Sequence, residues 1–285
     1  MATLSADKVR RLLNGEEKGT SDLKAAIQEL SDERITLLVA NGFPGDYLEM
    51  PYTCPDCQDT GYVGTKKCHC FLKAIIDLFY TQSNLKGLLE QENFEHFNFD
   101  YYSSNYRDRL SGQNSRELAT RAYQECMNFI RDFDTEHGNL LLFGNTGIGK
   151  TFLSHCIAKE VMDSLHSVLY LTASEFFDAL LEKALNRNDE SCLLYEQIHL
   201  CDLLIIDDLG TERNTDFVVS QLFVCLNDRI LNRKSTIIST NLTLEEIKTN
   251  YTERTFSRIS NHYKILRLAG DDIRIQKKLM YREEH

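Results

Sequence analysis

The 285-residue sequence has few prolines, no excess of positive charge and no long run of apolar residues. No run approaches the roughly 18–20 apolar residues that a helix needs to cross a bilayer. The N-terminal residues also lack the uninterrupted apolar stretch of a signal peptide. We therefore expect a cytoplasmic protein without a membrane partner.

Positive charge is scarce, because 32 Lys and Arg residues stand against 43 Asp and Glu residues, a formal net charge of −11 at pH 7. Proteins that coat nucleic acid usually present a strongly basic surface. The net negative charge therefore argues against a broad surface that binds nucleic acid. The C-terminal end, from Arg254 onward, is locally basic. Such a run is more often a solvated face than a binding site, so a local DNA contact stays an open alternative.

The only three prolines, Pro44, Pro51 and Pro55, lie within twelve residues. Proline interrupts regular structure and restricts the residue before it, so this stretch is predicted to be a connector. Before it, serine caps and helical apolar spacing predict a pair of short helices in residues 1–42. No internal repeat and no low-complexity tract is present.

From residue 115 onward, helical segments alternate with short apolar runs. The runs read "NLLLF", "SVLYLTA", "DLLIIDD" and "STIISTN". Short apolar runs separated by amphipathic helices are typical of a parallel sheet covered on both faces. The sequence therefore predicts an α/β domain.

A phosphate-binding loop is predicted in "GNTGIGKT", which comprises Gly144, Asn145, Thr146, Gly147, Ile148, Gly149, Lys150 and Thr151. Its glycines let backbone N–H groups converge on a phosphate at the start of a helix. Lys150 would reach the β- and γ-phosphates, and the Thr151 hydroxyl would bind Mg²⁺. The loop follows an apolar run and precedes an amphipathic helix, which is the context that the motif requires.

Two further runs end in polar residues that could complete this site. "LLIIDDLG" ends in two carboxylates, of which Asp207 would hold Mg²⁺ through water and Asp208 could polarise an attacking water. "STIISTN" ends in Asn241, which could contact the γ-phosphate or orient the water. The carboxyl ends of parallel strands line the ligand crevice of such sheets. Together with the phosphate loop, these residues predict ATP binding with Mg²⁺ and ATP hydrolysis.

The sequence has nine cysteines, and this odd number argues against a framework in which every cysteine is paired in a disulfide. Four of them cluster in "CPDCQDTGYVGTKKCHC" at Cys54, Cys57, Cys68 and Cys70. Four thiolates suit a structural, tetrahedral Zn²⁺ site. His69 could replace one cysteine as a ligand, and a reduced metal-free loop or an iron–sulfur cluster are the alternatives.

The motifs in this order resemble the AAA+ ATPases, and more narrowly the DnaC/DnaI helicase-loader group with its transposition relative IstB. The resemblance covers roughly residues 94 to 275 and rests on "LLLFGNTGIGKT", "LLIIDDLG", "IISTN", "ERTFSRI" and "GDDIR". It implies a five-stranded parallel sheet in the order 5-1-4-3-2, with "YKILRLAG" as the fifth strand. Too few residues follow Gly270 for the C-terminal helical lid of many AAA+ proteins.

The resemblance also implies roles for single residues. Asn241 corresponds to sensor 1, and Arg274 to the sensor 2 arginine. Arg258 corresponds to the arginine finger that reaches the nucleotide of a neighbouring subunit, with Arg254 as the second choice. Asp208 stands where many AAA+ motors have glutamate, whose side chain is longer.

The function implied by the resemblance is that of an ATP-dependent helicase loader. Residues 1–90 would form a helical and zinc-binding module that binds a DnaB-type replicative helicase, residues 91–115 a linker, and residues 116–285 the AAA+ ATPase domain. The ATPase domain would engage single-stranded DNA, and the protein could form a homo-oligomer on the helicase. The nearest alternative is an IstB-like ATPase helper of transposition. A small-molecule kinase and a switch that binds ATP without turnover are the others.

Overall fold

The computed structural model describes residues 20–48, 52–71, 73–74, 85–164, 166–185 and 189–283. The chain divides into two compact units, Met1–Asp59 and Thr60–His285. The first of the two helices predicted in residues 1–42 lies outside the described residues. The predicted boundaries at residues 90 and 115 stay predictions.

The described part of the first unit is built on helix α2 (Thr20–Ala40), which agrees with the second predicted N-terminal helix. A short turn-rich stretch follows the helix, where Phe43 and Leu48 lie beside α2 residues such as Leu37. Leu37 and Leu48 leave 59% and 60% of their surface exposed. Apolar side chains are therefore presented to the outside of this unit.

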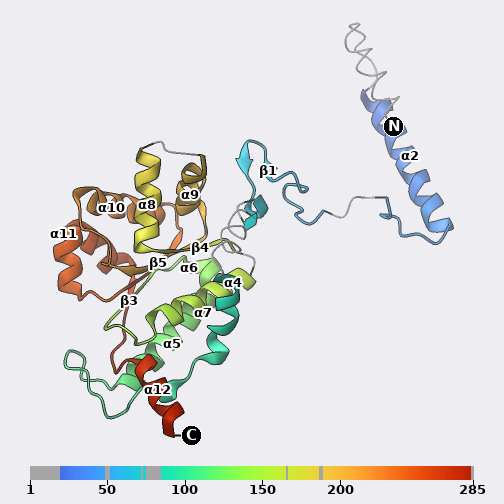
Figure 1. Ribbon diagram of the computed structural model, residues 1–285. Coiled ribbons are helices and arrows are strands. Elements are labelled where there is room, and N and C mark those ends of the chain that lie inside the picture. Colours follow the sequence, from blue (N-terminus) through green and yellow to red (C-terminus); the bar gives the residue numbers. More distant parts are fainter. Residues whose placement is uncertain are drawn as a thin grey trace. The chain divides into compact units, whose positions relative to one another are not determined.

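The second unit begins with a small hairpin and continues into a larger α/β domain (Figure 1). The hairpin consists of β1 (Tyr62–Val63) and β2 (Lys66–Lys67). The larger domain contains, in chain order, α4 (Leu85–Gln91), the 3₁₀ turns η1 (Phe94–His96) and η2 (Phe99–Tyr101), α5 (Ser115–Arg131), α6 (Phe133–Glu136), β3 (Leu140–Phe143), α7 (Lys150–Asp163), β4 (Val168–Thr172), α8 (Ala173–Ala184), α9 (Asp189–Leu200), β5 (Leu203–Leu209), α10 (Asp216–Leu231), β6 (Ser235–Thr240), α11 (Leu244–His262), β7 (Lys264–Arg267) and α12 (Ile273–Glu283).

The five core strands form one parallel sheet in the order β4-β5-β6-β3-β7. Numbered along the core as 1 to 5, this order reads 2-3-4-1-5, which is the predicted 5-1-4-3-2 read from the other edge. The predicted fold class is therefore confirmed. The predicted fifth strand is β7, and the helix α12 follows it.

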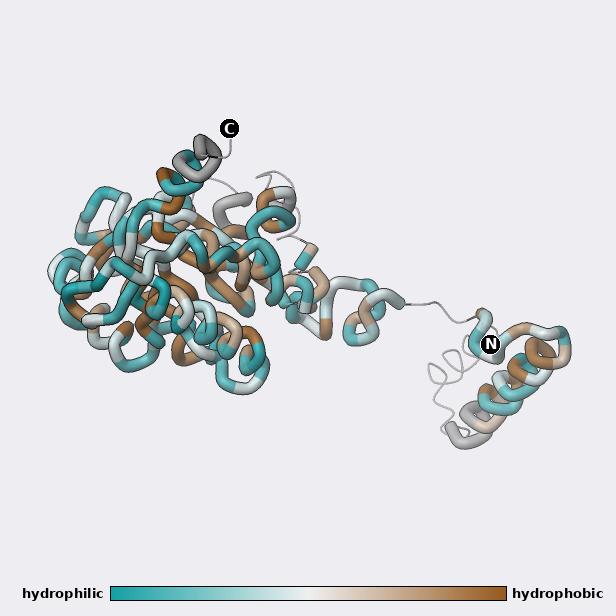
Figure 2. The backbone as a smooth tube through the Cα atoms, turned by 90° about the horizontal axis from the view of Figure 1, so that it is seen from below, coloured by the Kyte–Doolittle hydropathy of each residue, from teal (hydrophilic) through white to brown (hydrophobic). Residues whose placement is uncertain are grey.

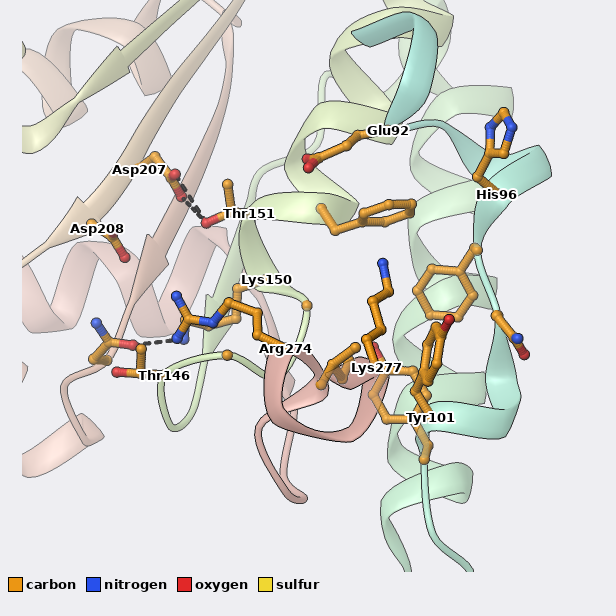
Figure 3. A pocket seen from close by; sticks show the side chains of 18 residues that line it. Glu92, His96, Tyr101, Thr146, Lys150, Thr151, Asp207, Asp208, Arg274 and Lys277 are labelled. Carbon is orange, nitrogen blue, oxygen red and sulfur yellow. Dashed lines mark hydrogen bonds between the residues drawn. The ribbon is translucent and has the colours of Figure 1, made fainter. Parts of the chain in front are cut away.

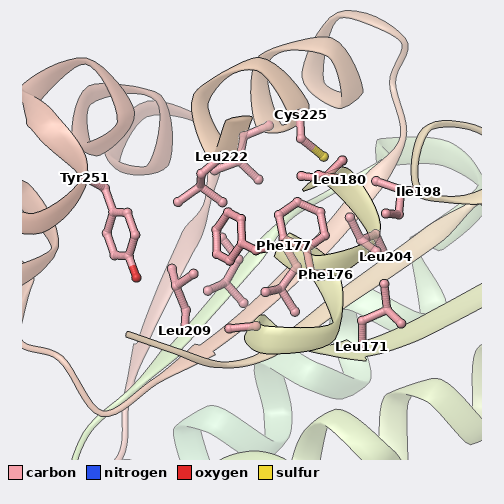
Figure 4. Close-up of a cluster of buried hydrophobic side chains, with 14 of the residues drawn as sticks. Leu171, Phe176, Phe177, Leu180, Ile198, Leu204, Leu209, Leu222, Cys225 and Tyr251 are labelled. Carbon is pink, nitrogen blue, oxygen red and sulfur yellow. The ribbon is translucent and has the colours of Figure 1, made fainter. Parts of the chain in front are cut away.

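Two hydrophobic clusters, one on each face of the sheet, form the core. Neighbouring residues of β5 point to opposite clusters, with Leu204 in one and Leu203 in the other. One face packs against α8, α9, α10 and α11, whose buried side chains include Phe176 and Leu222 (Figure 4). The other face packs against α4, α5 and α7. Hydrophobic stretches accordingly fill the middle of this unit in Figure 2. Among the described helices, none is long and apolar enough to cross a bilayer.

Candidate functional site

A cavity of about 430 Å³ opens at the carboxyl ends of the central strands (Figure 3). This size is typical of small-molecule pockets. The predicted site residues that line it are Thr146, Gly147, Gly149, Lys150, Thr151, Asp207, Asp208, Asn241 and Arg274. These residues lie in four separate stretches of the sequence, and the parallel sheet brings them together.

The predicted phosphate loop connects the fully buried strand β3 to helix α7, which starts at Lys150. All three of its glycines lie where a side chain would not fit, as Gly147 and Gly149 illustrate. Gly147 has φ +77°, and an added Cβ would lie 2.2 Å from the carboxylate of Asp272. Gly149 has φ +93°, and its Cβ would lie 2.5 Å from the hydroxyl of Tyr102. Glycine therefore provides both the left-handed turn and the room for neighbouring segments to pack on the loop.

The Lys150 ammonium is buried at the base of the loop, with 4% of the residue exposed. Its Nζ donates to the carbonyls of Gly144 (2.9 Å) and Asn145 (2.7 Å). It also donates to Oδ1 of Asn241 at 2.7 Å. Burial lowers the pKa of Lys150 to about 8, against the opposing attraction of Asp208 and Asp207. The side chain is thus a cation held in place by oxygen acceptors.

The two aspartates lie at an irregularity of β5, where the register with β6 shifts between Ile206 and Leu209. Asp208 adopts φ 55°, an uncommon left-handed conformation that aspartate tolerates better than most residues. Its backbone N–H donates to Oγ of Ser239 at 3.0 Å. The bulge therefore brings two consecutive carboxylates to one cavity, although neighbours in a regular strand would point to opposite faces.

Asp207 and Asp208 differ in their surroundings. Asp207 is 5% exposed, and its carboxylate accepts a hydrogen bond from the Thr151 hydroxyl at 3.0 Å. Asp208 is only partly buried, and the pKa of its carboxyl is raised by burial and by the charge of Asp207. Lys150 and Arg274 oppose this shift. A buried, hydrogen-bonded carboxylate beside a more exposed one whose pKa is raised suits one metal-binding and one proton-accepting role.

Arg274 reaches the cavity from the start of α12. Its guanidinium forms an ion pair with Asp272 at 3.0 Å, and Figure 3 shows it directed toward the side of the cavity where Lys150 and the aspartates lie. The segment before α12 is fixed to the phosphate loop, since the N–H of Ile273 donates to the Gly147 carbonyl at 2.8 Å. The short C-terminal helix therefore contributes one side of the cavity.

Arg258, the predicted arginine finger, does not line the cavity. It is exposed on α11, beyond a break at Tyr251 and Thr252 where Thr252 takes φ 71°. Arg254, the second choice, stacks its guanidinium on the ring of Phe223 at 4.5 Å. The exposure of Arg258 is compatible with a role on a neighbouring subunit. That role stays a prediction.

Residues that the sequence did not single out complete the cavity. They are Glu92, His96, Phe97, Asn98, Tyr101, Tyr102, Phe152, Ile273 and Lys277. Tyr102 is buried and donates its hydroxyl to the carbonyl of Ile148 at 3.1 Å, and Lys277 lies over the ring of Tyr101 at 5.3 Å. The dense aromatic run "NFEHFNFD" was the only sequence signal that this segment packs against the core.

The four clustered cysteines also meet. The Sγ atoms of Cys54, Cys57, Cys68 and Cys70 all lie within 4.8 Å of one another. Tetrahedral Zn²⁺ with bonds of about 2.3 Å would place its sulfur ligands about 3.8 Å apart, so the thiol set fits this ion. Nδ1 of His69 lies 3.5 Å from Sγ of Cys68, next to the set. The clustering predicted from the spacing is confirmed, and the arrangement can serve as a zinc site.

The oxygen ligands of the larger cavity fit a different metal. The Thr151 hydroxyl and the Asp207 carboxylate are hard oxygen donors of the kind that Mg²⁺ prefers. Lys150 and Arg274 supply positive charge beside them, and the start of α7 presents backbone N–H groups. The cavity can therefore hold a polyphosphate together with a divalent cation.

Comparison with known proteins identifies similar chains. The family model described as IstB-like ATP binding protein matches residues 81–280. The protein XkdC of the phage-like element PBSX in Bacillus subtilis is 27% identical over 246 residues, which cover 78% of this chain and 85% of XkdC. The replicative helicase loader DnaC of Escherichia coli is 23% identical over 180 residues, which cover 63% of this chain and 67% of DnaC.

The chromosomal replication initiator protein DnaA of Treponema pallidum is 26% identical over 164 residues, which cover 57% of this chain. The chain thus spans only about a third of that relative, 33% of its length. A crystal structure of a DNA replication initiation factor matches with a TM-score of 0.50 and 18% identity, covering 65% of this chain and 56% of the other. That structure shares the fold. Together the matches confirm the predicted resemblance to the helicase-loader group of the AAA+ ATPases.

Proposed function

The chain belongs to the family of IstB-like ATP-binding proteins, and from this premise we propose that it is a Mg²⁺-dependent ATPase that loads a DnaB-type replicative helicase onto single-stranded DNA. The observation that carries the proposal is the cavity that Lys150, Thr151, Asp207, Asp208, Asn241 and Arg274 line together. The named relatives DnaC and DnaA act in replication, which favours a loader over a helper of transposition.

ATP binding rests on the phosphate loop and the start of α7. The loop N–H groups and Lys150 hold the phosphates, and Thr151 and Asp207 hold Mg²⁺. The chemistry that Mg²⁺ supplies when bound is the neutralisation of charge on the phosphates. Arg274 adds a second cation from the C-terminal side of the cavity.

Hydrolysis requires a water molecule that attacks the γ-phosphorus while the bond to the bridging oxygen breaks and ADP leaves. Asp208 accepts a hydrogen bond from that water and takes its proton, and the raised pKa of its carboxyl suits a proton acceptor. Asn241 orients the water, and its Oδ1 is already fixed by Lys150 at 2.7 Å. Arg258 of a neighbouring subunit neutralises charge that develops on the γ-phosphate, which requires at least two subunits side by side.

Helicase binding is assigned to the N-terminal module, where apolar side chains are presented on the first compact unit. Leu30, Leu37, Leu38, Phe43 and Leu48 line a groove together with Glu33 and Arg34. An apolar groove with a charged rim suits a protein partner. The cysteine cluster, with Zn²⁺ bound, stabilises the fold of residues 52–71 and takes no part in catalysis.

The partner assignment is tested by native mass spectrometry of the full chain with its cognate DnaB-type helicase. The double variant L37D/L48D is expected to weaken the complex about 30-fold or more, because each charge falls in an apolar contact. The matched control is L110D, since Leu110 is 78% exposed in the second unit. Wild-type affinity in L37D/L48D would show that the groove is not the helicase site.

The ATPase assignment is tested separately by release of inorganic phosphate. Lys150→Ala is expected to lower turnover by about 100-fold or more, since it removes a cation that faces the transferred phosphoryl group. The same variant should keep the helicase complex. Phosphate release that is unchanged in Lys150→Ala would contradict the assignment of the catalytic cavity.

A further inference from the structure

The carboxylate of Asp207 is held by hydroxyl groups from three different elements. Thr151, at the start of α7, donates at 3.0 Å to Oδ2. Tyr170, on the neighbouring strand β4, donates to the same oxygen at 2.6 Å. Ser239, on β6, donates to Oδ1. Three donors fix the orientation of a carboxylate more tightly than one hydrogen bond or one ion pair does.

Tyr170 differs from Thr151 in its position. Thr151 lines the cavity itself, whereas Tyr170 is absent from the residues that line it. Tyr170 therefore acts on a bound ligand only through Asp207.

The ring of Tyr170 itself packs against a buried side chain. It packs against the imidazole of His155 on α7, with ring centroids 4.8 Å apart. His155 is 4% exposed, and its Nδ1 lies 2.5 Å from a carboxylate oxygen of Glu92, directly after α4. Glu92, His155 and Tyr170 thus form a continuous chain of contacts that ends on Asp207. Side chains that support a ligand residue in this way set the geometry of metal sites.

We infer that Tyr170 is a positioning residue that holds Asp207 in the orientation required to bind Mg²⁺ with ATP, and that the Glu92–His155 pair keeps Tyr170 in place. The inference rests on the proposed ATPase function and deepens it. The hydroxyls of Tyr170 and Ser239 fix the two carboxylate oxygens of Asp207, one on Oδ2 and one on Oδ1, and of these two donors neither lines the cavity. Without the Tyr170 hydroxyl, Asp207 can rotate and its affinity for the cation falls.

The test is the Mg²⁺ dependence of nucleotide binding by the full chain, measured with a fluorescent ATP analogue. In Tyr170→Phe, the Mg²⁺ concentration that gives half of the Mg²⁺-dependent binding is expected to rise about 10-fold, within the range of supporting residues in metal sites. Nucleotide binding in EDTA should be unchanged. The control is Tyr123→Phe, because Tyr123 packs among Phe94, Phe97 and Phe99 and not against Asp207.

Two outcomes separate this inference from the proposed function. A wild-type chain that binds the analogue without any effect of Mg²⁺, or not at all, overturns both. A wild-type chain with Mg²⁺-dependent binding whose Tyr170→Phe variant keeps the same half-saturating concentration overturns the inference alone. A rise in Tyr123→Phe as large as in Tyr170→Phe also overturns it, since the effect would then be a general loss of packing.

The role of the Glu92–His155 pair is tested by combining variants. Glu92→Gln is expected to raise the half-saturating Mg²⁺ concentration by a smaller factor, about 3-fold, and to add nothing in the Tyr170→Phe background. Non-additive effects are the signature of residues that act through one another. Factors that multiply in the double variant would show that Glu92 acts on the cavity directly, which overturns this part of the inference.

Discussion

The cysteine loop and the phosphate loop are both short turns that bring ligand atoms together, but they are held in different ways. The cysteine loop contains only the two-residue strands β1 and β2. The side chains that it buries are mainly those of its own cysteines. The phosphate loop lies between a fully buried strand and a helix that packs on the sheet. We therefore expect the cysteine loop to depend on a bound metal, and the phosphate loop to depend on the core around it.

This difference predicts how each loop responds to loss of its ligand. A segment with a poor core takes its folding free energy from metal coordination. A loop supported by a sheet keeps its geometry when the ligand leaves, so mutations there change binding and leave the fold intact. The following predictions test the contrast from the largest effect to the smallest.

The largest effect is expected from zinc removal. Structural Zn²⁺ contributes roughly 10–16 kcal/mol in small zinc-folded peptides, so chelation or Cys57→Ser should expose residues 52–71 to protease. Native mass spectrometry should report one zinc per chain before chelation and none in the variant. Cys225→Ala is the control, since this buried thiol belongs to the core and not to the cluster. A chain purified without zinc would contradict the assignment.

The second largest effect is expected for an ion pair that attaches a loop to strand β7 of the sheet without a metal. Asp108, whose side chain is 2% exposed, forms a paired contact with Arg267 of β7 at 2.6 Å and 2.9 Å. Burial opposes its ionisation, but the bonds from Arg267 and Ser111 lower the pKa of Asp108 to about 2. Asp108→Asn is expected to reduce the unfolding free energy by about 3 kcal/mol, because it leaves a guanidinium without its counter-charge.

Urea-induced unfolding followed by circular dichroism measures this change. Because the folded pKa is below the unfolded value, the stabilisation is present above about pH 4 and is lost as the pH falls toward 2. Asp163→Asn serves as the control. Its ion pair with Lys159 is largely exposed, so it should cost less than about 1 kcal/mol. Equal losses in both variants would show that burial of the Asp108 pair is unimportant.

The smallest effect is the pH dependence of nucleotide binding. Lys150 has a lowered pKa of about 8, so its positive charge is present below this value and is lost as the pH rises through it. Affinity for ATP should therefore fall about 10-fold from pH 7 to pH 9. Binding measured with the fluorescent analogue in Lys150→Met should be weak and nearly independent of pH over this range. A flat profile in the wild type would place the proton-linked group elsewhere.

Much of the fold and half of the cavity could be predicted from sequence, because the signals are local. The phosphate loop needs glycine at fixed positions, and an apolar run that ends in two aspartates predicts β5. The strand order came from the resemblance, and the structure confirms it. The clustering of four cysteines followed from their spacing, and it too is confirmed.

The rest depends on contacts between distant segments. Glu92 and Tyr102 reach the cavity because two 3₁₀ turns pack on α5 and α7, and no periodic pattern encodes that approach. Tyr170 meets Asp207 only through the pairing of β4 with β5. Arg229 lies on the buried face of α10, where arginine is rare, and it donates to backbone carbonyls, including that of Ser235. Such roles follow from tertiary structure alone.

The order of the strands has a consequence for synthesis of the chain. β3, which leads into the phosphate loop, is the first strand of the sheet in sequence but lies between β6 and β7, the last two. The pair β4 and β5 can therefore form while β3 still has no neighbour. Lys150 meets Asn241 only after β6 has been made, and β7 closes the sheet later still. We therefore expect a nascent chain to gain a complete nucleotide site only after β6 has been synthesised.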